Sequence, residues 1–138
     1  MSTLDILDRL IGFDTVSARS NLAMVDYIET FLADRGFTIT RIPDPTGEKA
    51  GLYATLGPVG AGVLLSGHTD VVPVEGQDWT RPEFKLTRED DRLFGRGTTD
   101  MKSFVACMLT AADRAAKADL KAPLSLALSY DEEIGCVG

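Results

Sequence analysis

The sequence predicts an α/β fold in which helices flank a mixed β-sheet. Three segments have features of helices, such as apolar residues at helical spacing in residues 22–32, and they separate several short apolar or alternating runs that are typical of strands. The chain has 138 residues, of which 44% are hydrophobic and 25% charged. It is therefore long enough and apolar enough to form the core of one domain, and this composition argues against disorder.

The helical segments have recognisable beginnings and ends. Ser2 or Thr3 can cap the first helix, because a side-chain oxygen there can accept a free backbone N–H. Ser20 or Asn21 can cap the second helix, and Gly36 can end it. The third helix is rich in alanine. The expected helices cover residues 4–12, 22–35 and 101–117.

The predicted strands differ in character. Residues 37–42 alternate between apolar and polar side chains, and residues 62–66 form the short apolar run expected of a buried strand. Residues 124–130 have the pattern of a central strand. A further strand covers residues 51–56, and a hairpin pairs 84–86 with 92–94 around the charged turn 88–91.

Composition narrows the possible partners. The net charge is −7 and spread along the chain, whereas nucleic-acid binding needs a basic face, so no nucleic-acid partner is expected. Cys107 and Cys136 are too few for a secreted disulfide framework. Charged residues interrupt residues 1–10, unlike a signal peptide, and no apolar run approaches the ~20 residues of a membrane helix. The sequence therefore predicts a cytoplasmic protein with no membrane contact.

His68 and Asp70 form the first of three polar clusters, each after a predicted strand or before a predicted helix, where α/β sheets bind ligands. His68 is the only histidine, and a lone histidine is more often structural than functional. Residues two apart in an extended segment face the same side, so Asp70 can accept the second ring N–H of His68, as partners of metal-ligating histidines do. The alternative is that Asp70 caps a turn near Val71.

The other two clusters are acidic. Asp100 precedes the third helix, where its carboxylate can either cap the helix or point towards a cation. Asp131, Glu132 and Glu133 repel one another unless a cation or a shared proton offsets the cost, although a solvated turn is the alternative. Adjacent residues in an extended stretch point apart, so one glutamate can hold a metal while the other faces water.

Other side chains have structural interpretations. Trp79 and Phe84 are expected to pack beneath a loop, and Cys107 is expected in the core. Arg96 and Lys102 could meet an anion, but a surface position or local pairing is favoured.

The donor set predicts which metals can bind. Carboxylates with one imidazole suit zinc, cobalt or manganese. If Asp100 bridges two metals, His68 completes one side and Glu133 the other. Each metal is then short of protein ligands, so either the site is weak or further ligands come from additional chain.

Three motifs in this order resemble the M20 family of metallohydrolases over most of the chain. They lie at residues 66–73, 93–102 and 131–135. Within that family, the segments 12–17, 44–56 and 135–138 are most similar to the acetylornithine deacetylases. The resemblance implies the amino-terminal part of a zinc-peptidase-like catalytic domain.

The resemblance also implies roles for the acidic residues and the histidine. His68 would ligate one of two divalent metal ions, zinc in preference to cobalt, while Asp100 would bridge both ions and Glu133 would ligate the other. Glu132 would be the general base, and Asp70 would be the catalytic partner of His68. A cis peptide bond after Asp100 is a further expectation.

The implied reaction is hydrolysis of N-acetyl-L-ornithine, a small N-acyl amino acid, to ornithine and acetate in arginine biosynthesis. The sister activities of a succinyl-diaminopimelate desuccinylase, an aminoacylase or a carboxypeptidase are the alternatives, as is a non-catalytic fragment or scaffold. The family supplies a further acidic ligand, a second histidine and a lid and dimerisation domain from sequence beyond Gly138. Residues 1–138 alone are therefore expected to be inactive and prone to associate, and the full-length protein is expected to be a homodimer.

Overall fold

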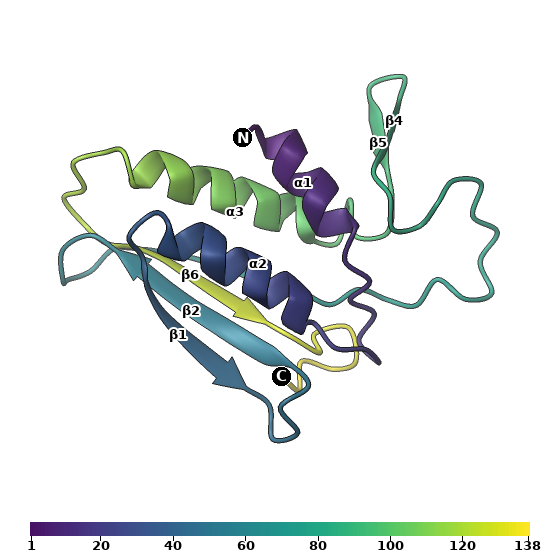
Figure 1. The fold of residues 1–138 in the computed structure, drawn as a ribbon, viewed down its shortest axis with the longest axis horizontal. Coiled ribbons are helices and arrows are strands. Elements are labelled where there is room, and N and C mark those ends of the chain that lie inside the picture. Colours follow the sequence, from purple (N-terminus) through teal and green to yellow (C-terminus); the bar gives the residue numbers. More distant parts are fainter.

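Three helices form one layer over a four-stranded sheet in the computed structural model, which describes residues 1–138 (Figure 1). Helices α2 (Leu22–Ala33) and α3 (Lys102–Ala115) pack on the sheet, and α1 (Thr3–Ile11) packs against α3. None of these helices has the length and the apolar character needed to span a bilayer.

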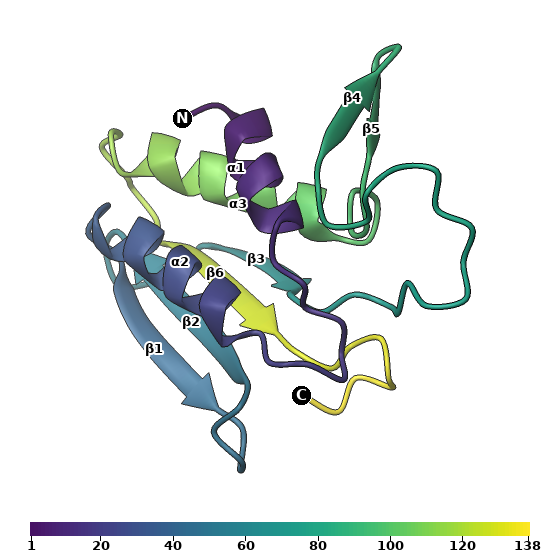
Figure 2. The same ribbon diagram turned by 45° about the vertical axis from the view of Figure 1, so that its right-hand side comes forward.

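The sheet is mixed, with strand order β1-β2-β6-β3. β1 and β6 both run antiparallel to β2, whereas β3 runs parallel to β6. A separate hairpin, β4–β5, projects away from the sheet (Figure 2). The predicted α/β fold and the central position of the 124–130 strand are therefore confirmed. The strands are β1 (Thr38–Pro43), β2 (Ala50–Leu56), β3 (Val63–His68), β4 (Thr87–Glu89), β5 (Arg92–Phe94) and β6 (Leu124–Ser129).

Helix α1 begins with the predicted cap. Ser2 Oγ accepts the Asp5 backbone N–H at 3.2 Å, and the Asp5 carboxylate accepts the Ser2 N–H at 2.7 Å. This capping box satisfies two N–H groups that have no partner inside the helix. The buried face of α1 consists of Ile6, Leu7, Leu10 and Ile11.

Helix α2 is capped differently from the expectation. Asn21 occupies the N-cap position, but its side chain makes no capping hydrogen bond. It is buried and instead bonds the backbone N–H and C=O of Ala50, at 2.9 and 2.8 Å, and Thr69 Oγ1, at 2.9 Å. Ser20 Oγ accepts the Leu22 N–H at 3.2 Å. The tertiary contacts of Asn21 satisfy a buried amide more completely than a single cap bond, because both its N–H₂ and its oxygen are engaged.

The core lies between the helices and the sheet. Burial of each large apolar side chain there contributes roughly 1.5–3 kcal/mol. Leu126 and Leu128 of β6 belong to the same buried cluster as Met108 and Leu109 of α3. The central strand β6, which leads to the third polar cluster, pairs with a strand on each side and is covered by α3.

Strand β3 is not the buried strand that its apolar sequence predicted. It is an edge strand, and Val63 and Leu64 are 58% and 57% exposed. Only Gly67 and His68, near the end of the strand, are buried. An apolar run predicts a strand, but it does not say which other elements will pack against that strand. Association of the isolated chain through this edge stays a prediction.

Two residues of α3 also differ from expectation. Cys107 is exposed, while Lys102 is completely buried and its Nζ donates to the Phe13 carbonyl at 2.6 Å. Burial lowers the pKa of Lys102 to about 7. The reason is helical geometry: Lys102 shares the inward face with Val105 and Leu109, whereas Cys107 lies off that face.

The hairpin is confirmed with a shifted first strand. Its turn is formed by Asp90 and Asp91, with φ of 45° and 61°. A two-residue turn with positive φ at both positions suits a tight hairpin, and aspartate tolerates this conformation better than most residues. The short turn draws Arg88 and Glu89, expected in the loop, into β4.

Candidate metal centre

The parallel pairing of β3 and β6 brings the first and third polar clusters together. His68 ends β3 and pairs with Ser129 at the end of β6, just before the acidic cluster. His68, Glu132 and Glu133 each offer one ligand atom, and these atoms lie within 4.8 Å of one another. Residues far apart in sequence therefore converge at one edge of the sheet.

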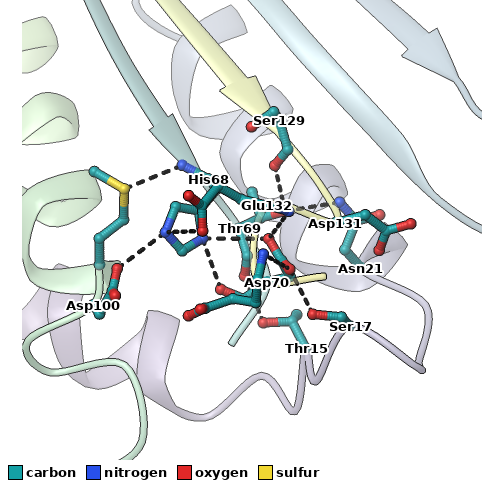
Figure 3. Close-up of polar contacts among 12 residues, drawn as sticks. Thr15, Ser17, Asn21, His68, Thr69, Asp70, Asp100, Ser129, Asp131 and Glu132 are labelled. Atoms are coloured by element: carbon teal, nitrogen blue, oxygen red, sulfur yellow. Dashed lines mark hydrogen bonds and ion pairs between the residues drawn. The ribbon is translucent and has the colours of Figure 1, made fainter. Parts of the chain in front are cut away.

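Asp100 lies beside His68, and a polar contact joins its carboxylate to the ring (Figure 3). His68 Nε2 is 3.0 Å from Asp100 Oδ1 and 3.6 Å from Glu132 Oε2. Ionised carboxylates only accept hydrogen bonds, so a proton or a cation must lie between Nε2 and these oxygens. The donor set is one imidazole nitrogen with carboxylate oxygens, which fits a divalent metal such as zinc.

The other ring nitrogen faces Asp70. His68 Nδ1 is 3.0 Å from the Asp70 carbonyl oxygen and 3.3 Å from its carboxylate Oδ1. An Nδ1–H that donates to the carbonyl leaves the Nε2 lone pair directed at the acidic groups. The hydrogen bond expected from the Asp70 side chain is thus made by its backbone.

The Asp70 carboxylate has a different set of partners. It accepts the Ser17 hydroxyl at 2.5 Å and the backbone N–H groups of Glu132 and Glu133 at 3.1 and 3.2 Å. It caps no turn at Val71, the alternative that the sequence left open. Asp70 is buried and fixes the backbone from which both glutamate side chains extend.

Asp100 does not cap α3. Met101 occupies the N-cap position, and the expected cis peptide bond between Asp100 and Met101 is present. The preceding turn needs Gly97, whose φ is 89° and where a Cβ would lie 3.0 Å from Lys102 and 3.1 Å from Val71. This close packing places the Asp100 carboxylate beside His68.

The carboxylates of the cluster repel one another, and this repulsion favours the binding of a cation. Burial raises the pKa of the Glu133 carboxyl, and the nearby charges of Asp100, Asp70 and Glu132 add to that effect, while His68 partly offsets it. Burial alone would lower the pKa of His68. The hydrogen bonds with Asp100 and with the Asp70 carbonyl outweigh it, so the pKa lies above the ordinary value of 6.5. Acidic groups that are hard to ionise together are stabilised by a bound metal ion.

A cavity of about 490 Å³ opens beside Asp100 and Glu133. Trp79 and Arg96 line it, although Trp79 was expected to be a packing residue. The Arg96 guanidinium lies 5.0 Å from the centre of the Trp79 ring, and its Nη2 donates to Gln77 at 2.6 Å. Ser17, whose hydroxyl donates to Asp70, carries no signal in the sequence except its place in the 12–17 segment.

If His68 ligates a metal ion, metal binding should weaken as pH falls. Zinc ligation requires neutral His68, so protons compete with zinc once the pH drops through its raised pKa. In the metal-free protein the sign is opposite: protonated His68 stabilises the fold below about pH 6.5, and this contribution is lost as pH rises through the raised pKa. Calorimetric zinc titration of the full-length protein from about pH 8 to pH 5.5 measures this dependence. An affinity that is constant over that range would contradict zinc ligation by His68.

The chain is similar in sequence to known proteins. Residues 64–138 match peptidase family M20/M25/M40. An acetylornithine deacetylase of Myxococcus xanthus is 41% identical over 96% of the chain and 35% of its own length, and one of Salmonella arizonae is 36% identical over 98% and 37%. The chain therefore spans about a third of the length of these curated relatives.

Solved structures share the fold. An M20 family metallo-carboxypeptidase, Sso-CP2 of Sulfolobus solfataricus, matches with a TM-score of 0.86 and 25% identity over 100% of this chain and 32% of its own. Human carnosine dipeptidase 1 matches with a TM-score of 0.84 and 25% identity over 98% and 33%. Because the family match covers more than half of the chain and includes the residues that converge at the sheet edge, the chain belongs to peptidase family M20/M25/M40.

Proposed function

We propose that this chain carries part of the active site of a metal-dependent amidohydrolase that removes the acetyl group from N-acetyl-L-ornithine. The observation that carries this proposal is the convergence of His68, Glu132 and Glu133, with ligand atoms within 4.8 Å of one another, beside Asp100 and a cavity of about 490 Å³. Curated relatives named acetylornithine deacetylase support the choice of substrate.

His68, Asp100 and Glu133 are the proposed ligands of two divalent ions, zinc in preference to cobalt. Asp100 would bridge the two ions, His68 would complete one side and Glu133 the other. When bound, the ions polarise the substrate carbonyl and acidify a water molecule. Three protein ligands are too few for two ions, so we propose that the catalytic domain extends beyond these 138 residues and supplies further ligands.

Glu132 is the proposed general base. Its Oε2 lies 3.6 Å from His68 Nε2, and its side chain is 42% exposed, so it can reach both the metal centre and a water molecule. The Glu132 carboxylate accepts a proton from the attacking water and then delivers it to the leaving amide nitrogen. The amide C–N bond breaks, a C–O bond forms, and the products are acetate and ornithine.

The whole protein is proposed to be a cytoplasmic homodimer with a separate lid and dimerisation domain, acting on small N-acyl amino acids in arginine biosynthesis. The length of the relatives, of which this chain spans about a third, supports a larger protein.

Peptide hydrolysis is the second candidate. The likeness to a metallo-carboxypeptidase and a dipeptidase at 25% identity favours it, because the same metal chemistry cleaves peptide bonds.

Substrate assays on the full-length protein separate these functions. N-acetyl-L-ornithine, N-succinyl-diaminopimelate, other N-acyl amino acids and dipeptides should be compared by kcat/KM, before and after chelation and with zinc restored. The expected result is highest kcat/KM for N-acetyl-L-ornithine, lost on chelation and recovered with zinc. A preference for another substrate would replace the deacetylase assignment with that sister activity. Absence of turnover with all of them would favour the non-catalytic alternative.

A further inference from the structure

Asp131, the first member of the acidic cluster, does not join the metal-binding group. Its carboxylate lies 2.6 Å from Lys49 Nζ, and both side chains are largely buried, at 13% and 18% exposure. Lys49 Nζ also donates to the Ser17 carbonyl at 2.6 Å. Lys49 precedes β2, so this contact ties the start of one strand to the turn that follows β6.

The backbone at Asp131 is left-handed. Its φ is 55°, a left-handed conformation that residues other than glycine adopt at a cost. Such a conformation persists only when surrounding contacts hold it. Asp131 directly precedes Glu132, so the direction in which Glu132 and Glu133 leave the sheet depends on this turn.

Two sets of contacts hold that turn. The Asp70 carboxylate accepts the N–H groups of Glu132 and Glu133, and Lys49 holds the Asp131 carboxylate. Ser17 joins the two sets, since its hydroxyl donates to Asp70 while its carbonyl accepts from Lys49. Lys49 and Asp131 therefore contact the turn that carries the glutamates, and neither belongs to the candidate metal ligands.

We infer that the Lys49–Asp131 pair is a positioning device for the two glutamates: it holds Asp131 in its left-handed conformation and so aims Glu133 at the metal and Glu132 at the water. The inference rests on the proposed metallohydrolase function. Lys49 is a positioning residue, because it acts through Asp131 and belongs neither to the cavity lining nor to the candidate metal ligands.

The first test replaces Lys49 by methionine in the full-length protein, which keeps much of the side-chain bulk and removes the charge. Removing a group that orients a metal ligand typically lowers metal affinity or activity by ~10–100-fold. We expect kcat to fall by ~10-fold or more with KM little changed, and zinc affinity of the metal-free protein to fall by a similar factor. Lys49→Arg, which keeps a cation within reach of Asp131, should recover most of both properties.

The second test is a double-mutant cycle. Asp131→Ala should reproduce the defect of Lys49→Met, and the double variant should be no worse than either, because both changes break one device. Asp131→Asn keeps an acceptor for Lys49 and tolerates positive φ, so it should be nearly normal.

The matched control is Arg35→Met. Arg35 forms an ion pair of similar burial with Asp113, at 22% and 26% exposure and 2.7 Å, which joins the segment after α2 to α3 and lies away from the cluster. It should lower the thermal unfolding midpoint without changing kcat or zinc affinity. If Lys49→Met behaves like this control, the pair is only structural and the inference is wrong. If the unsubstituted protein neither binds zinc nor hydrolyses substrate, the proposed function fails instead.

Discussion

Replacing Glu132 by glutamine in the full-length protein should leave bound metal near normal and slow hydrolysis by ~10²–10⁴-fold, the usual effect of losing a general base. Glutamine keeps the size and most of the hydrogen bonding of glutamate but cannot accept a proton. The 42% exposure of the Glu132 side chain is consistent with a group that faces water. Metal analysis and deacetylation rates of the same preparations measure the two effects separately.

Glu133→Gln is the matched partner of this experiment. It weakens a charged ligand whose carboxyl has a raised pKa because it is buried near other acidic groups. Metal content should fall together with activity. The structure makes the comparison necessary, because ligand atoms of both glutamates lie within the same 4.8 Å cluster with His68. Loss of metal in Glu132→Gln with metal and activity retained in Glu133→Gln would reverse the two roles, and unchanged rates in both would refute the active site.

Asp70→Ala should lower stability and activity together. The substitution leaves the Ser17 hydroxyl and the N–H groups of Glu132 and Glu133 without their acceptor. An unsatisfied buried donor costs about 1–3 kcal/mol, so the free energy of unfolding should fall by at least ~2 kcal/mol. Zinc affinity should fall ~10–100-fold, as is typical when a group that orients ligands is lost.

Denaturant unfolding and zinc titration of the metal-free protein measure the effects of Asp70→Ala. Asp113→Ala is the control, because Asp113 pairs only with Arg35 and Lys117 and lies away from the cluster. It should leave zinc affinity unchanged. A normal zinc affinity in Asp70→Ala would show that Asp70 does not hold the glutamates in place.

Local sequence patterns were sufficient for most of the fold. Helix α1 has its cap and its apolar face within ten residues, and β6 has the apolar run of a central strand. These elements depend on side-chain period and capping chemistry, which are local properties. The motifs around His68, Asp100 and Glu133 could also be found in the sequence, because each lies after a predicted strand or before a predicted helix and resembles a motif of the family.

The tertiary structure decided which side chains meet. The exposure of β3 and the burial of Lys102 depend on which elements pack against them, so their local patterns were misleading. The same holds for Asn21, whose cap position is local but whose hydrogen bonds reach β2 and the segment after β3. Lys49 carried no signal except its place in the 44–56 segment, because its partner Asp131 is 82 residues away. A sequence specifies the period and the ends of its elements directly, whereas the partners of a buried polar group are fixed only when strands such as β2, β3 and β6 align in register.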